Sequence, residues 1–225
     1  MKISKVTLYV HDLSRMENFY CSKLGFKMLQ KTPTSFAIKI GESILAFEET
    51  HPEEQKQYHF AFNIPSNLFQ EAKNWLGAYA PLLKDNGQDE VYFERIDAHS
   101  FYFYDPEENV VELIARSINP EIDADSFTAE AIQSIGEINL TVDDLLNVGE
   151  QLKTLGIPVR NNERLVETSL NFMGDSRGDA YLLLGPKKRK WYFSEKDAVV
   201  SRIQIIIDDK LQLNIEEDGK FHYKK

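Results

Sequence analysis

The chain has 225 residues, 42% of them hydrophobic, and a formal net charge of −10 at neutral pH. This hydrophobic content suffices for a packed core, and the acidic balance leaves no basic excess for a phosphate backbone, so we expect no nucleic-acid partner. The single cysteine, Cys21, excludes an intrachain disulfide. With no secretory signal and no apolar run near the roughly 20 residues that span a bilayer, we expect a cytoplasmic protein without a membrane partner.

The first 49 residues predict a βαβββ unit. Residues 3–10 alternate with β-branched side chains, which indicates a strand. Residues 15–23 carry apolar side chains at helical spacing, and Gly25 ends that run. Three short strands are expected at 26–31, 34–40 and 43–49.

The same pattern restarts at residues 58–64, which predict the first strand of a second unit. A helix follows with Phe69, Ala72 and Leu76 on one face. The strands that complete this second unit are expected near 90–95, 99–104 and 109–116.

A third start lies at residues 135–145, which match residues 3–13 in apolar pattern and in the closing Asp-Leu. A helix is expected over 146–155. Strands are expected near 157–160, 169–174 and 180–185, and the tail predicts two more, at 201–207 and 212–216. Internal repetition of this kind is strong evidence for a repeated architecture.

These elements predict an α+β fold in which repeated βαβββ units form an open, cup-shaped mixed β-sheet. We expect residues 1–116 to form a paired two-unit domain. Residues 117–130 are polar, contain a proline and lack periodicity, which indicates a linker. Residues 131–225 are then a degenerate third unit with C-terminal strands.

Two short stretches of the second unit carry the chemistry. His59 lies near the start of the strand Tyr58-His59-Phe60-Ala61-Phe62, and Glu112 lies in the stretch that begins at Asp105 and runs Asp-Pro-Glu-Glu-Asn-Val-Val-Glu-Leu. An imidazole and a carboxylate that point into one sheet face make half of a divalent-metal site.

The repeated unit, opened by His-Phe-Ala-Phe and closed by Asp-Pro-x-x-Asn-x-x-Glu-Leu, resembles the vicinal oxygen chelate superfamily. This group includes the glyoxalases, the ring-cleaving dioxygenases and the bleomycin-binding resistance proteins. The resemblance covers residues 1–116 well and 135–187 loosely. The family's usual glycine before the asparagine is replaced by Glu108, so the tight turn must be made with a less permissive residue.

The resemblance implies that two units enclose a divalent Fe, Mn, Zn or Ni ion in the cup. Its ligand positions fall at Lys5, Ala46 (or Glu48 on the same strand face), His59 and Glu112. An ammonium cannot ligate a dication, and at 4 Å it would oppose the metal by about 4 kcal/mol at an effective dielectric near 20. Lys5 would instead be a fixed cation or, with Glu112, a catalytic group.

The third unit offers fewer candidates. Glu137 falls where Lys5 falls in the first unit, but the closing strand 180–185 has no carboxylate. The cluster Lys187-Lys188-Arg189-Lys190 precedes Trp191 and could bind an anion, although such a run is more often a solvated turn.

Candidate substrate-binding residues lie on the strand 99–104. Alternation places His99 and Phe101 on one face of this strand and Tyr102 on the other. Any of the three could line a cavity, although aromatic side chains in such strands usually belong to the core.

Three functions are therefore open. The first is a glyoxalase- or dioxygenase-like protein that binds a small molecule in the cup with an incomplete metal site. The second is a metal-dependent lyase, isomerase or ring-cleaving dioxygenase that uses His59, Glu112 and a further ligand such as Glu48 or His99. The third is a non-catalytic interaction module in which the third unit mediates self-association, and a homodimer is expected as a partner arrangement.

Overall fold

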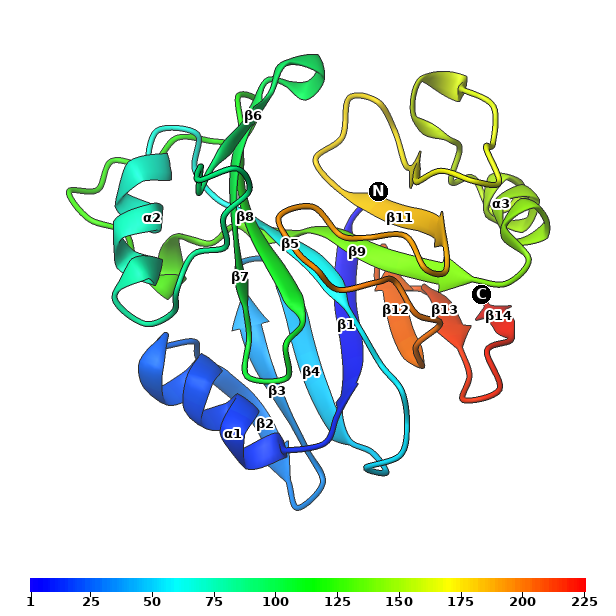
Figure 1. Ribbon diagram of the computed structural model, residues 1–225, viewed down its shortest axis with the longest axis horizontal. Coiled ribbons are helices and arrows are strands. Elements are labelled where there is room, and N and C mark those ends of the chain that lie inside the picture. Colours follow the sequence, from blue (N-terminus) through cyan, green and yellow to red (C-terminus); the bar gives the residue numbers. More distant parts are fainter.

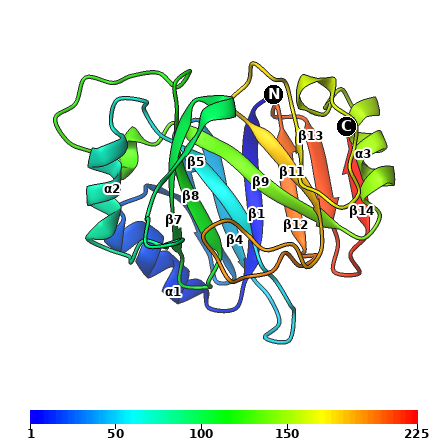
Figure 2. The same cartoon turned by 45° about the horizontal axis from the view of Figure 1, so that its top comes forward.

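The structure is a computed structural model that describes all 225 residues. Its strands form two curled mixed sheets that pack on each other (Figure 1, Figure 2). Across sheet A the order is β14 (Phe221–Lys224), β13 (Leu211–Ile215), β12 (Ile203–Ile207), β1 (Ile3–Val10), β4 (Ser43–Glu49), β3 (Ser35–Ile40) and β2 (Met28–Thr32). Across sheet B it is β10 (Asn171–Met173), β11 (Tyr181–Pro186), β9 (Ser134–Val142), β5 (His59–Asn63), β8 (Val110–Arg116), β7 (Ala98–Tyr104) and β6 (Val91–Phe93).

Each unit contributes one helix outside its strands. The three are α1 (Leu13–Glu17), which continues as a π-helical turn over Asn18–Lys23, α2 (Phe69–Gly77) and α3 (Leu145–Thr154). Asp12 and Asp144 begin α1 and α3 at equivalent places, because each carboxylate accepts a hydrogen bond from a backbone N–H of the first turn. The predicted α+β fold of repeated βαβββ units is confirmed. No helix is both long and apolar enough to cross a membrane.

The resemblance implies that units one and two pair with each other, but in the structure they do not. β5 of unit two runs antiparallel to β9 of unit three, and β1 of unit one runs antiparallel to β12 of the tail. Units one and two therefore lie in different sheets (Figure 1). The first strand of each unit pairs on one side with the last strand of the same unit, so only its other edge is free. In unit one, β12 pairs with this free edge of β1 and buries Ile203, Ile205 and Ile207. The division of the chain at 117–130 stays a prediction, because both sheets draw strands from either side of it.

Two local predictions fail for identifiable reasons. The strand expected at 157–160 is reduced to a single bridge from Val159 to Met173, because Asn161 and Asn162 take left-handed backbone conformations that end it. The tail holds three strands instead of two, since β14 adds to β13 after a turn at Gly219.

Alternation along the strands separates a core face from a cavity face in sheet B. Phe60 and Phe62 of β5 join Val6 and Leu8 of β1 in one hydrophobic core that both sheets share. The opposite face of sheet B carries polar side chains and is covered by residues 187–202, which we call the strap (orange in Figure 1). The side chains of the cup therefore lie beneath the strap and not between the sheets.

The Asp105 turn fixes the starts of β5 and β8 relative to each other. The Asp105 carboxylate accepts hydrogen bonds from the backbone N–H groups of Glu107 (2.9 Å) and Asn109 (3.0 Å). The Asn109 side chain in turn accepts one from the backbone N–H of Tyr58 at 3.2 Å. Glu108 completes this turn with φ of 60°, the conformation in which a glycine is least strained.

Replacing Glu108 tests this strain. We expect Glu108→Gly to be more stable than Glu108→Ala by about 1 kcal/mol, because both lose the carboxylate but only alanine keeps a Cβ in the left-handed region. Urea unfolding followed by circular dichroism measures the difference. Equal stability of the two variants, or a more stable alanine variant, would show that the turn is not strained.

Candidate functional site

Three adjacent strands of sheet B bring an imidazole and two carboxylates together. In the strand register, Ala61 of β5 lies opposite Glu112 of β8 on one side and opposite Glu137 of β9 on the other. His59 lies two residues before Ala61 and therefore on the same face. The small side chain of Ala61 leaves open the space into which the flanking carboxylates extend. One ligand atom from each of His59, Glu112 and Glu137 lies within 4.8 Å of the others.

The imidazole of His59 is held in one orientation. Its Nδ1 lies 3.0 Å from the carbonyl oxygen of Val110, to which it donates, and its Nε2 lies 3.5 Å from Oε2 of Glu112. Burial lowers the pKa of His59 to about 4. The ring is therefore neutral at physiological pH and presents the Nε2 lone pair to the two carboxylates, which is the form in which histidine binds metals.

The two carboxyl groups are almost completely buried, at 3% exposure for Glu112 and 5% for Glu137. Burial, and next the neighbouring Glu137, raise the pKa of Glu112 to about 8. Burial also raises the pKa of Glu137, against the opposing effect of Arg116. Without a cation between them, protonation of Glu112 and the guanidinium paired with Glu137 relieve the repulsion between the two groups.

Arg116 is fixed from two sides on the strand face next to the cluster. One terminal nitrogen forms an ion pair with Oε1 of Glu137, and the other donates to Oδ1 of Asn63. Asn63 also donates to Ser134 and approaches Gly136 so closely that a Cβ there would clash with its amide. Gly136 is thus required for the close approach that keeps Arg116 against Glu137.

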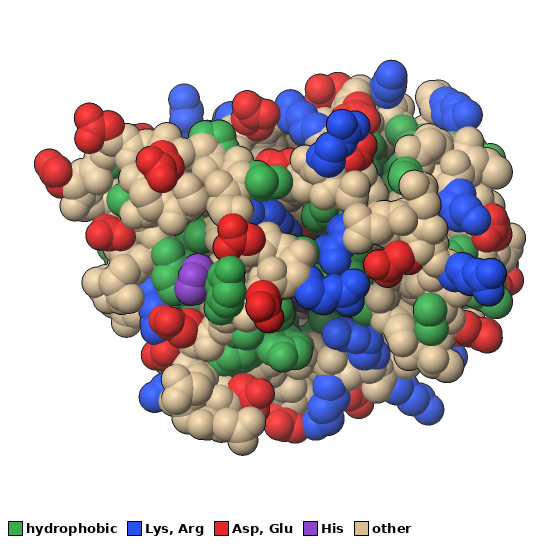
Figure 3. All heavy atoms as spheres, turned by 90° about the horizontal axis from the view of Figure 1, so that it is seen from above, with side chains coloured by type: hydrophobic (Ala, Val, Ile, Leu, Met, Phe, Trp, Pro, Cys, Tyr) green, Lys and Arg blue, Asp and Glu red, His purple; other side chains and the backbone are tan.

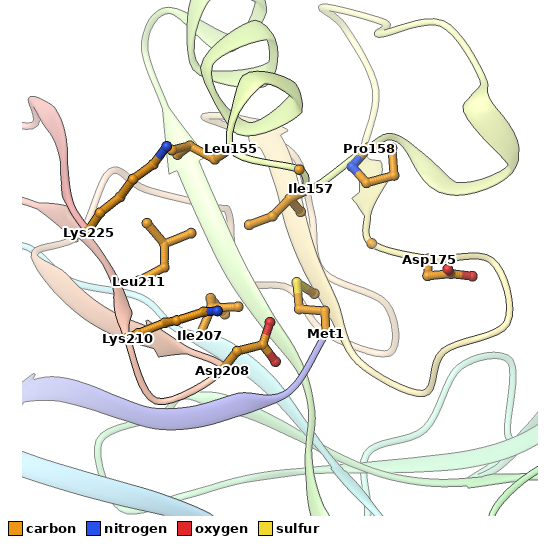
Figure 4. A pocket seen from close by; sticks show the side chains of 12 residues that line it. Met1, Leu155, Ile157, Pro158, Asp175, Ile207, Asp208, Lys210, Leu211 and Lys225 are labelled. Carbon is orange, nitrogen blue, oxygen red and sulfur yellow. The ribbon is translucent and has the colours of Figure 1, made fainter.

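The cluster lies at the floor of a cavity of about 220 Å³. Its walls are largely aromatic and come from the strands of sheet B, the segment after β6, and the strap. The aromatic and cationic side chains that line it with the cluster are Phe93, Tyr102, Phe172, Arg189, Trp191 and Tyr192. A larger hollow of about 640 Å³ lies between the β12–β13 hairpin and the end of α3 (Figure 4), but it contains no part of the cluster.

The structure brings together three of the residues that the sequence indicated. His59 and Glu112 meet in one hollow, and Tyr102 lines it. The remaining residue of the cluster, Glu137, occupies in unit three the position that Lys5 holds in unit one. The repeat pattern located this position, but only the pairing of unit two with unit three reveals that it faces His59.

The other four residues predicted for the site do not line this cavity, which corrects the prediction for Lys5, Glu48, His99 and Phe101. Lys5 and Glu48 belong to β1 and β4 of sheet A, so neither reaches the cavity of sheet B. His99 and Phe101 lie on the face of β7 that points away from it. There His99 packs against Tyr92 (ring centroids 4.7 Å apart), and Phe101 is buried in the main core.

Two family models match separate parts of the chain. Residues 2–113 match the model of the glyoxalase/bleomycin resistance protein/dioxygenase superfamily, and residues 135–189 match the model of the toxoflavin-degrading enzyme. This chain belongs to the vicinal oxygen chelate superfamily. No curated protein matches it significantly.

Solved structures are similar to this superfamily member at low identity, and one of them shares its overall fold. A Bacillus subtilis protein described as a dioxygenase is 16% identical, with a TM-score of 0.56 over 82% of this chain and 64% of its own. A lactoylglutathione lyase from Agrobacterium tumefaciens is 23% identical over 50% of this chain and 91% of its own, with a TM-score of 0.42. A variant of the fosfomycin resistance protein of Listeria monocytogenes, solved with Mn(II) and 1S,2S-dihydroxypropylphosphonic acid, is 21% identical over 52% and 91%, with a TM-score of 0.41.

The raised pKa of Glu112 predicts how the metal-free protein depends on pH. A carboxyl group whose folded-state pKa is raised stabilises the fold fully below its ordinary pKa, and this stabilisation is lost as the pH rises to about 8. In EDTA, the free energy of unfolding should therefore fall more steeply between pH 5.5 and 7.5 in the wild type than in Glu112→Gln. One proton corresponds to about 1.4 kcal/mol per pH unit at most.

Urea titrations at several pH values measure the two slopes. Glu48→Gln, which alters an exposed glutamate of sheet A, is the matched control and should run parallel to the wild type. Parallel curves for the wild type and Glu112→Gln would mean that Glu112 is ionised throughout this pH range.

Proposed function

We propose that this protein is a metal-dependent enzyme that acts on a small molecule in the cavity of sheet B. The observation that carries the proposal is the buried cluster of His59, Glu112 and Glu137, whose ligand atoms lie within 4.8 Å of one another. One imidazole and two carboxylates suit a divalent first-row ion such as Mn(II), Fe(II) or Zn(II). In this proposal Glu137 is the third ligand, in place of the Glu48 or His99 expected from the sequence.

The donor atoms fit a divalent ion on chemical grounds. Nε2 of His59 is directed at Glu112 while its Nδ1–H is bound to Val110, which is the arrangement that orients a metal-binding histidine. Two carboxylates buried side by side repel each other unless a cation or a proton lies between them. When bound, a divalent ion would act as a Lewis acid that polarises adjacent oxygens of a substrate.

The protein's own residues would prepare the cavity for such chemistry. The strap and Tyr102 cover the cluster and exclude bulk water, which strengthens electrostatic interactions inside. Arg116 keeps Glu137 in place. In the metal-free protein the pKa of Glu112 is about 8, so binding of a divalent ion would release a proton from this carboxyl group near neutral pH. The match of residues 135–189 to a model named for toxoflavin degradation supports a degradative reaction on a small molecule.

A metal-free binding protein is the second candidate, and the ion pair between Arg116 and Glu137 favours it. In that case Arg116 and a protonated Glu112 would satisfy the buried carboxylates without a metal. A non-catalytic interaction module would be favoured by a cup filled with apolar side chains, but a cavity of about 220 Å³ is present. The homodimer and the cytoplasmic location stay predictions, and units two and three complete the cavity within one chain.

Manganese binding decides between the first two candidates. We expect the wild type, stripped with EDTA and titrated with Mn(II), to bind one ion per chain, as measured by electron paramagnetic resonance of the free ion. Glu137→Gln and His59→Ala should each weaken binding at least tenfold, because each removes a ligand.

Glu48→Gln should bind Mn(II) as tightly as the wild type, since Glu48 lies in the other sheet. Circular dichroism confirms that each variant is folded. If the wild type binds no Mn(II), Fe(II) or Zn(II), or if Glu137→Gln binds as well as the wild type, the metal-dependent function is wrong.

A further inference from the structure

Two hydrogen-bond donors of the strap are buried at the cavity without an acceptor. Nη1 of Arg189 and Nε1 of Trp191 are inaccessible to solvent and have no partner in the protein. Both side chains line the cavity above the cluster, and Trp191 is only 4% exposed. Because a buried donor without an acceptor is costly, the pair indicates where an absent acceptor belongs.

Arg189 has no carboxylate partner, unlike most of the basic residues around it. Lys188 and Arg202 of the strap also lack an ion pair, but neither of them lines the cavity. Arg116 forms an ion pair with Glu137, and Lys187, Lys190 and Lys196 form ion pairs with acidic residues outside the cluster. The guanidinium of Arg189 instead lies over the ring of Trp191, 5.1 Å from its centroid. A charge that is partly buried and unpaired favours an anion at the same place.

Aromatic rings beside these donors pack on one another and form walls of the cavity. The ring of Trp191 lies 4.7 Å from that of His59 at an interplanar angle of 31°. Across the cavity, Tyr102 stacks on Phe193 of the strap with centroids 5.0 Å apart and an angle of 17°, which anchors the strap to β7. Aromatic walls of this kind bind planar ring systems through stacking and edge contacts.

The surroundings of the cavity favour anions as well. A second hollow of about 340 Å³ shares Ile96 with the cavity and is lined by four arginines, Arg95, Arg116, Arg160 and Arg177. The space-filling view from above shows several basic side chains around a central hollow (Figure 3). Arg95, Arg116 and Arg177 form ion pairs with acidic residues, whereas Arg160 has no ion-pair partner and would attract a negatively charged ligand.

We propose that the cavity recognises a planar aromatic anion, and that Arg189 and Trp191 determine this specificity by donating hydrogen bonds to its charged oxygen group. The inference rests on the proposed function, because the ligand occupies the cavity above the His59–Glu112–Glu137 cluster. The planar fork of Arg189 suits a carboxylate or a delocalised oxyanion, to which it can donate two parallel bonds. The indole N–H adds a third donor from the same strap.

Two flat probes of nearly equal shape test the assignment. Isothermal titration calorimetry compares 2-naphthoate, which is an anion, with 2-naphthamide, which is neutral, on the metal-free protein and on the protein with Mn(II). We expect the wild type to bind 2-naphthoate at least tenfold more tightly than 2-naphthamide. Arg189→Gln should abolish this preference by weakening 2-naphthoate tenfold or more, while 2-naphthamide changes less than twofold.

Further variants separate charge, geometry and folding. Arg189→Lys keeps the charge without the fork and should retain part of the preference, and Trp191→Phe should weaken 2-naphthoate about threefold through the lost N–H. Lys188→Gln removes an exposed charge from the same strap and should bind both probes like the wild type. The proposal is overturned if the wild type fails to bind 2-naphthoate, or if Arg189→Gln and Arg189→Lys both keep its full affinity.

The experiment also separates this inference from the proposed function. Loss of Mn(II) binding with an intact, Arg189-dependent preference for 2-naphthoate would remove the metal-dependent enzyme and leave the anion site. Normal Mn(II) binding with no effect of Arg189→Gln on either probe would remove the anion site alone.

Discussion

The site depends on one geometric constraint, the register of β5 between β8 and β9. That register places Ala61 between Glu112 and Glu137, and it puts His59 on the same face. Two buried carboxylates side by side are unfavourable by themselves, so the fold has to hold them there. The hydrogen bonds of the Asp105 turn fix the start of β8 against β5, and the contact of Gly136 with Asn63 fixes Arg116 beside Glu137.

The strap gives this strand face its character as a binding site. Without residues 187–202, His59 and Tyr102 would lie uncovered on the open face of sheet B. With the strap in place, Trp191 and Phe193 pack against those two rings and enclose a cavity. The same segment then leads into β12, which completes sheet A. The connection that closes the cup of sheet B is thus also the one that covers the free edge of β1.

The repeated unit could be recognised from the sequence because its strands and helices each produce a local residue pattern. Apolar alternation recurs in each unit, and the Asp-Leu helix start and the glycine after the helix recur in units one and three. These patterns predicted most strands and all three helices. The choice of pairing partner is not local. The free edges of β1, β5, β9 and β12 are all compatible with one another in pattern, so the sequence could not show that unit two faces unit three. For this reason Lys5 and Glu48 were expected in the cup and Glu137 was not.

The same argument explains which site residues could be predicted. His59 and Glu112 belong to one unit, and their meeting follows from the parallel pairing of β5 with β8 inside that unit. Tyr102 follows from alternation along β7. Arg189 and Trp191 stood out as a basic and aromatic run, but a loop has no periodicity, so nothing in the sequence could place it over the cluster.

The most direct measurement is anomalous diffraction at the manganese edge from crystals of the protein grown with Mn(II). The account predicts one strong peak per chain that is coordinated by Nε2 of His59 and by carboxylate oxygens of Glu112 and Glu137, beneath the strap. Density without a peak at this position, or a peak at another group of residues, would contradict it.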